Sequence, residues 1–161
     1  MKTRILMVVS TVLAAVIGCC VITKRNSQLE YAAYNELLNA GATGDDWVGW
    51  LELVTGRPPV VQLDVPANIP KEDAFRCIRH MRNLESLELA YDSLADEEIL
   101  IISNLRLNSL VFTGNYPTDE TVSDLLVFSK IRFLYVPSGN LSDDSIEHLR
   151  LGLPSVKIET R

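Results

Sequence analysis

The chain has 161 residues, of which 47% are hydrophobic and 22% charged, a composition that excludes intrinsic disorder and suits one domain or a short array of repeats. All 21 acidic residues lie after residue 23, so residues 24–161 carry a net charge of 13 − 21 = −8. Such an acidic domain argues against binding to nucleic acid, which needs a basic face, and against attachment to anionic lipid by charge alone.

Residues 5–23 are an apolar stretch without a charge, flanked by two basic residues on each side, namely Lys2, Arg4, Lys24 and Arg25. As a helix the stretch would be roughly 28 Å long, close to the roughly 30 Å of a hydrocarbon core. We therefore expect residues 1–23 to be a single uncleaved membrane span. Three alternatives stay open: a cleaved secretory signal, a buried helix, and a lipoprotein signal in which Cys19 of VIGC is lipidated. The flanking charges weakly favour a domain outside the cytoplasm.

Residues 24–59 are predicted to form a helical N-terminal cap on the domain that follows. Ser27 and Glu30 fit a capping box at the start of a first helix, which also has an apolar face. The alternative for this helix is a spacer between the membrane and the domain. A second helix is predicted from Asp45–Asp46 onward, because apolar residues recur there at helical spacing, namely Trp47, Trp50, Leu51 and Val54. We expect the tryptophans to pack on the first strand, with an aromatic ligand site as the alternative.

From residue 60 the pattern L-x-x-L-x-L, with any apolar residue in the L places, recurs at intervals of 24, 23, 24 and 22 residues. The copies begin at Val60, Leu84, Leu107, Ile131 and, in a truncated form, Leu153. Five copies at nearly constant spacing predict a row of short strands. The ninth place of the first four copies is polar or glycine, namely Asn68, Asp92, Asn115 and Gly139 followed by Asn140. These polar side chains are expected to bond to the backbone of the neighbouring copy.

Each strand is followed by a segment with acidic residues first and then apolar residues at helical spacing, over residues 69–81, 94–105, 117–128 and 141–152. Acidic residues in a first turn complement the helix dipole, so each segment is predicted to be a helix. The expected fold class is α/β, with a parallel sheet on the concave side and helices on the convex side. Cys77 is expected to be a small buried residue.

The segments LESLELAYDSLADEEI and LNSLVFTGNYPTDETV resemble leucine-rich repeats of the ribonuclease-inhibitor-like group. More narrowly, they resemble bacterial proteins built on L-x-x-L-x-L-x-x-T-x-I-T-D-x-G-L. The I-T-D element is retained as LAD, PTD and LSD, and the glycine after it is absent. The resemblance covers roughly residues 45 to 161. It implies a short leucine-rich-repeat solenoid of about 4.5 copies over residues 60–161, which binds a partner without catalysis or a cofactor.

A catalytic or metal site is not expected from the residues themselves. The two histidines, His80 and His148, fall on different predicted helices. The acidic pairs Asp45–Asp46 and Asp143–Asp144 lie at predicted helix starts, where acidic residues have a structural role. The sequence has no H-E-x-x-H motif, paired C-x-x-C motifs, Gly-rich phosphate loop or G-x-S-x-G motif.

Binding is expected on the concave face, formed by the residues between the apolar positions of each strand. The candidate residues are Asp64, Glu88, Val111, Phe133, Tyr135 and Lys157. Phe133 and Tyr135 are the best anchors, because aromatic residues are enriched at interface hot spots. Five strands cover only roughly 240 Å², whereas a standard interface buries about 800 Å² per partner, so the strand-end loops must also contribute.

The sequence therefore predicts a membrane-tethered module that binds an unidentified protein or a cell-surface polymer. The alternative is a structural membrane protein whose repeats associate with copies of themselves.

Overall fold

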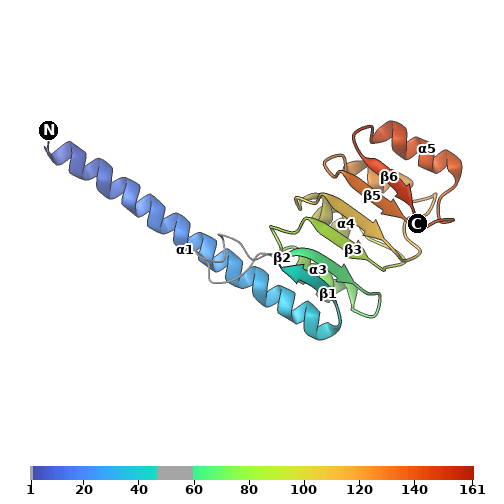
Figure 1. The fold of residues 1–161 in the computed structure, drawn as a ribbon, viewed down its shortest axis with the longest axis horizontal. Coiled ribbons are helices and arrows are strands. Elements are labelled where there is room, and N and C mark those ends of the chain that lie inside the picture. The colour runs from blue at the N-terminus through green and yellow to red at the C-terminus, as the bar shows by residue number, and fades with distance from the viewer. Residues whose placement is uncertain (1, 47–59) are drawn as a thin grey trace.

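The computed structural model describes the backbone of residues 2–46 and 60–161 and the side chains of residues 14–45 and 60–161. Within these ranges the chain is an α/β protein with one six-stranded, mostly parallel sheet in the order β1-β2-β3-β4-β5-β6 (Figure 1). The strands are β1 (Thr43–Asp46), β2 (Val60–Val65), β3 (Ser86–Leu89), β4 (Ser109–Phe112), β5 (Phe133–Val136) and β6 (Lys157–Thr160). The helices are α1 (Lys2–Ala40), α3 (Lys71–Ile78), α4 (Asp96–Ser103), α5 (Asp143–Gly152) and the 3-10 helix η1 (Val122–Val127).

The five predicted strands are confirmed as β2 to β6, and each pairs in parallel with the next. The central apolar residue of each copy pairs with its counterpart, along the row Leu63, Leu87, Leu110, Leu134 and Ile158. All five side chains are buried, whereas the alternate residues of β3, Ser86 and Glu88, stay partly exposed. One face of the sheet therefore packs into the core, and the other, which we call the open face, keeps side chains in contact with solvent.

The predicted helices over 69–81, 94–105 and 141–152 are confirmed as α3, α4 and α5, whose buried side chains join the same core as the strands. Each has acidic residues in its first turn, and Ser142 also caps α5 by accepting a hydrogen bond from the Ser145 amide at 3.3 Å. Cys77 is buried in α3 as predicted, and this burial raises the pKa of its thiol.

The prediction of an α-helix over residues 117–128 is wrong, because this segment holds only the short 3-10 helix η1. The Thr121 hydroxyl accepts a hydrogen bond from the Thr118 amide at 3.0 Å, so local side-chain bonds compete with helical ones. The β-branched residues Thr121 and Val122 also disfavour an α-helix. Leu125 and Phe128 are nevertheless buried, so the segment still covers the core.

Helix α1 runs without a break from Lys2 to Ala40, which makes the predicted helix start at Ser27 wrong. No Gly or Pro lies between Val21 and Ala40, so nothing interrupts the helical backbone there. The helix ends at Gly41, whose positive φ of 108° and whose amide bond to the Leu38 carbonyl (3.1 Å) suit a C-terminal cap.

The last part of α1 packs against the β1–β2 end of the sheet and against α3 (Figure 1). Ala33, Tyr34 and Leu37 contribute to the core, and the Tyr34 hydroxyl donates a hydrogen bond to the Gly44 carbonyl at 2.7 Å. Asn83 Nδ2 donates to Glu30 Oε2 at 2.9 Å, a contact that joins α1 to the loop before β3. This part of α1 therefore covers the end of the core, the role predicted for the N-terminal cap.

The predicted second cap helix is wrong at its start, because Asp45 and Asp46 belong to β1, which pairs antiparallel with β2. The tryptophans and aliphatic residues predicted to follow them, from Trp47 to Val54, lie outside the described residues. Among the helical residues whose side chains the structure describes, none form a segment long and apolar enough to cross a membrane.

Candidate functional site

The strand pairing aligns the predicted binding residues in two rows across the open face. The first row is Gln62, Ser86, Ser109, Phe133 and Lys157, and the second is Asp64, Glu88, Val111, Tyr135 and Glu159. All six candidate residues therefore lie on one face, as predicted. Val111 is nevertheless only 6% exposed, so the prediction that it offers contact surface is wrong. It lies in the central strand, between Glu88 and Tyr135, where neighbouring side chains shield it best.

The aromatic pair Phe133 and Tyr135 forms the most distinctive part of the open face. Their rings are stacked, with centroids 6.3 Å apart and an interplanar angle of 14°. The Arg161 guanidinium lies 4.1 Å from the Tyr135 centroid, and Arg132 and Lys157 lie 5.7 and 6.0 Å from that of Phe133. These distances are in the range of cation–π contacts, so three cations surround a partly exposed aromatic pair.

The other end of the open face is acidic. Asp64 and Glu88 are paired across β2 and β3, and Asp45 of β1 pairs with Gln62 on the same face. Burial and then the nearby Asp64 charge raise the pKa of Glu88, while Arg161 opposes this shift. The open face therefore changes from anionic at β1–β3 to aromatic at β5–β6, where Arg132 and Arg161 lie by the rings and Lys157 is ion-paired with Glu159.

The loops that leave the strands are bonded to one another. Asp92 Oδ1 accepts hydrogen bonds from the amide and side chain of Asn115 at 3.0 and 2.9 Å, and Asn140 Nδ2 donates to the Gly114 carbonyl at 3.2 Å. These bonds confirm the predicted link from one copy to the next. A Cβ at Gly114 would lie 2.4 Å from the Tyr91 carbonyl oxygen, so only glycine permits this close approach.

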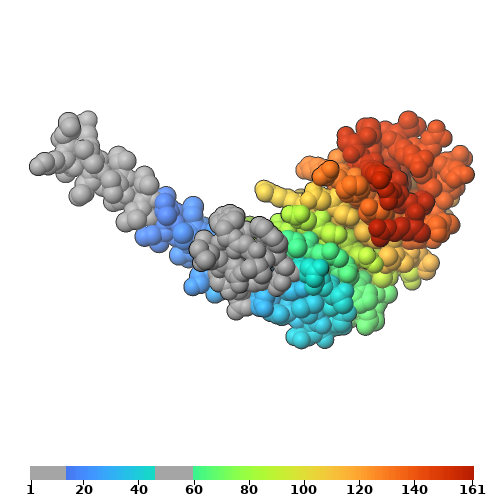
Figure 2. Space-filling view, in the orientation of Figure 1, coloured from blue at the N-terminus to red at the C-terminus, as the bar shows by residue number. Residues whose placement is uncertain are grey.

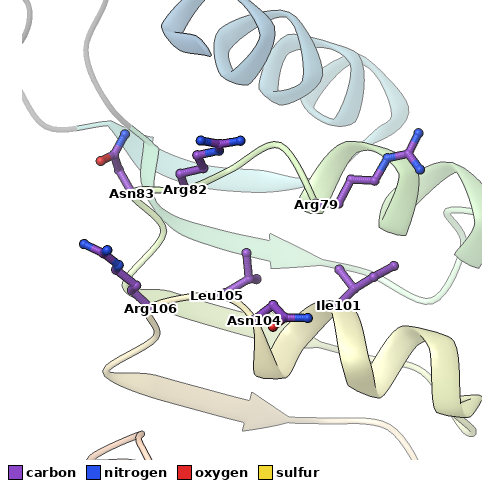
Figure 3. Close-up of a pocket in the computed structure, with 7 residues that line it drawn as sticks. All are labelled: Arg79, Arg82, Asn83, Ile101, Asn104, Leu105 and Arg106. Atoms are coloured by element: carbon purple, nitrogen blue, oxygen red, sulfur yellow. The ribbon is translucent and has the colours of Figure 1, made fainter. Parts of the chain in front are cut away.

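A second surface, not predicted, is a basic hollow between the segments that end α3 and α4 (Figure 3). It measures about 460 Å³ and is lined by Arg79, Arg82, Asn83, Ile101, Asn104, Leu105 and Arg106. The figure shows Arg79 and Arg82 after α3, and Arg106 after α4, on the two sides of the hollow. None of these arginines makes a salt bridge with a carboxylate in the described part of the chain.

Catalytic geometry is not found among the residues that the structure describes. His80 lies just after α3 and His148 on α5, with two further strand-and-helix units between them in the sheet order. Asp143 and Asp144 occupy the first turn of α5, the structural role predicted for them. Across the described ranges, no group of three or more His, Cys, Asp or Glu residues is arranged to hold a metal ion.

Sequence reasoning missed Asp45, Arg161 and the three arginines of the hollow. Asp45 has no pattern of its own, because its place on the face depends on the antiparallel pairing of β1. Two of the three arginines do leave a signal, because a basic residue lies within two positions of the first apolar place in three consecutive copies, at Arg82, Arg106 and, outside the hollow, Arg132. A comparison of the flanks of each copy would have found that signal.

No protein-family model matches the chain, and no curated protein matches it by sequence.

Proposed function

We propose that the chain is a membrane-tethered leucine-rich-repeat module that binds a protein or a cell-surface polymer through the open face of its sheet. The observation that carries the proposal is the stacked pair Phe133 and Tyr135, which is partly exposed and surrounded by three cations. Aromatic residues and arginine are the types most enriched at binding hot spots. A partner with acidic or aromatic groups opposite β5–β6 and basic groups opposite β2–β3 would complement this face.

The repeat part of the proposal is supported by the match between sequence interval and strand pairing. Leu63, Leu87, Leu110 and Leu134 are separated by 24, 23 and 24 residues, and each pairs directly with the next. A unit of strand, loop and helix that stacks only on its neighbours is the architecture of a solenoid. The concave side would then be the open face.

The membrane part of the proposal is supported by α1. Its described residues 14–22 are all exposed, and Val16, Ile17, Val21 and Ile22 are each more than half exposed. Such side chains on a part of α1 that projects from the sheet (Figure 2) are suited to a hydrocarbon environment. Cys19 is also exposed on this part of α1, so lipidation there remains the alternative means of attachment.

Self-association is the second candidate function, and three exposed side chains on the helical side favour it. Leu100 of α4 is 60% exposed, Val127 of η1 52% and Leu151 of α5 75%. They occupy three consecutive units and could form one apolar contact between two copies of the chain. This contact would lie on the other side of the sheet from the aromatic pair.

Site-specific photocrosslinking distinguishes the two functions. A photoreactive phenylalanine analogue would replace either Tyr135 or Leu100 in the full-length chain, expressed in cell membranes. A heterologous adduct from position 135 with none from position 100 is the expected result. An adduct of twice the chain mass from position 100 would instead support self-association, and the absence of any adduct from 135 would count against the open face.

The matched control is the double substitution Phe133→Ala with Lys157→Ala in the chain that carries the crosslinker at position 135. It removes one ring and one cation from the surface without touching the core, so circular dichroism should show an intact fold. The adduct should fall at least about tenfold, which corresponds to losing about 1.4 kcal/mol of binding free energy.

A further inference from the structure

The two ends of the parallel strands carry opposite charge. The segments that enter β3, β4 and β5, residues 79–85, 104–108 and 129–132, contain five Arg or Lys residues and one Glu. The segments that leave these strands, residues 90–98, 113–121 and 137–144, contain eight Asp or Glu residues and no Arg or Lys. Residues 24–161 have a net charge of −8, but the entry segments form a basic edge. Its residues are Arg79, Arg82, Arg106, Lys130 and Arg132.

The basic edge faces the side toward which the N-terminal half of α1 extends. Figure 1 shows the strands pointing away from that side, so their entry loops lie nearest to the free part of α1. Figure 3 shows a later part of α1 on the side of the hollow that Arg79 and Arg82 line.

The contact between α1 and the loop before β3 determines how far this edge lies from the end of the proposed membrane span. Asn83, which lines the hollow, is bonded to Glu30 at 2.9 Å. Glu30 lies seven residues after Thr23, the last residue of the uncharged stretch, which is about 10 Å along a helix. The headgroup layer of a bilayer is about 5–8 Å thick on each side, and screening extends the reach of its charge by about another 8–10 Å. If residues 5–23 cross the membrane, the loop that holds Asn83 and its neighbour Arg82 therefore lies within reach of the charge of lipid phosphates.

We infer that the basic edge binds the anionic headgroups of the same membrane that holds α1. The hollow between α3 and α4 measures about 460 Å³, enough room for a phosphate group, and its three guanidinium groups are suited donors to one. Arg79 and Arg106 have no salt-bridge partner among the described residues, so the headgroup does not compete with an internal one. The contact directs the acidic segments that leave β3, β4 and β5 away from the membrane and the open face sideways. This inference rests on the proposed membrane span.

The test is hydrogen–deuterium exchange of the full-length chain in two kinds of nanodisc, one of phosphatidylcholine alone and one with 30% phosphatidylglycerol. Amides of residues 79–85 and 104–108 are expected to exchange at least about threefold more slowly in the anionic nanodisc. Because each arginine near an anionic surface contributes about fivefold to binding, Arg79→Gln with Arg106→Gln should remove this difference, as should 0.5 M salt. Arg82 is left unchanged because its charge also acts on Glu30.

The matched control is Lys71→Gln, which removes one positive charge from the start of α3, at the opposite ends of the strands, and should keep the difference. Equal exchange of the two loops in both nanodiscs, together with protection of residues 5–23, would overturn the headgroup contact and leave the membrane span in place. Free exchange of residues 5–23 in both nanodiscs would instead overturn the span, and the contact that rests on it.

Discussion

The row of parallel strands and the junction with α1 are held together by different interactions. In the strands, one apolar residue per copy stacks on the next, and Leu63, Leu87 and Leu110 are completely buried. At the junction polar contacts also complete the core, including the hydrogen bond from Asn83 to Glu30. Glu30 is only 4% exposed. Non-directional apolar burial tolerates many sequences, whereas a buried carboxylate requires a specific partner.

The two regions should therefore respond differently to substitution and to pH. The strand core should lose stability whenever volume is removed, at any pH. The junction should gain stability when its buried charge is removed, because burial disfavours the charged form of Glu30 more than its hydrogen bonds and the Arg82 charge favour it.

The largest expected effect is in the strand core. Leu110→Ala should lower the free energy of unfolding by about 2–5 kcal/mol, since it leaves a cavity in the central row. Urea unfolding of residues 24–161 measures this change. The control Leu100→Ala, at an exposed position, should change it by less than about 0.5 kcal/mol. A loss below about 1 kcal/mol for Leu110→Ala would contradict the importance of the stacked row.

The next effect is at the junction and has the opposite sign. Glu30→Gln should raise stability at pH 7 by about 1–2 kcal/mol, because glutamine keeps an acceptor for Asn83 without a buried charge. The control Glu36→Gln removes an exposed carboxylate that pairs with Arg76, and should cost less than about 1 kcal/mol.

The pH dependence follows from the direction of the Glu30 shift. Burial raises the pKa of Glu30 above its ordinary value, despite the hydrogen bonds from Asn83 and the charge of Arg82. The folded state therefore holds this proton more tightly than the unfolded state, and stability should fall as pH rises from about 4.5 through the raised pKa. Unfolding curves from pH 4 to 7 should show this fall in the natural chain and a smaller one in Glu30→Gln. Identical slopes of stability against pH in the two proteins would contradict the assignment of this pH dependence to Glu30.

The smallest effect compares two buried tyrosines of the strand-end loops. The Tyr91 hydroxyl donates to the Ile69 carbonyl at 3.0 Å, whereas the Tyr116 hydroxyl is buried without a partner in the described structure. Tyr91→Phe should cost about 1 kcal/mol, and Tyr116→Phe should be neutral or slightly stabilising. Equal losses in thermal unfolding would show that the Ile69 bond contributes nothing.

Alkaline titration gives a second measurement on the same pair. Burial raises the pKa of Tyr91 to about 12 and moves the pKa of Tyr116 in the same direction. Because the unfolded state releases these protons first, stability should fall as pH rises above about 10.

The strands and most of the helices could be predicted because a repeated apolar residue must face the core in every copy. The same reasoning failed at η1, where Thr118 and Thr121 form local bonds, and at Ser27, where a capping pattern lies inside a continuous helix. It failed again at Asp45, whose place depends on a strand paired in the opposite direction. The candidate site was predicted in its aromatic part, since alternation assigns Phe133 and Tyr135 to one face. The basic hollow depends on how two entry loops approach each other, which no single copy reveals.

Because helix α1 is unbroken, the sheet has a fixed orientation relative to the first half of the helix. Each residue of an α-helix adds a rotation of about 100° about the helix axis and a rise of about 1.5 Å along it. One residue added between Thr23 and Glu30 would therefore rotate the open face by about 100° about the axis of α1. Its distance from the first half of α1 would change by only about 1.5 Å. If the first half of α1 spans a membrane as proposed, a partner in that membrane would meet the open face from one direction only, so the number of residues in α1 would specify a direction of approach as well as a distance.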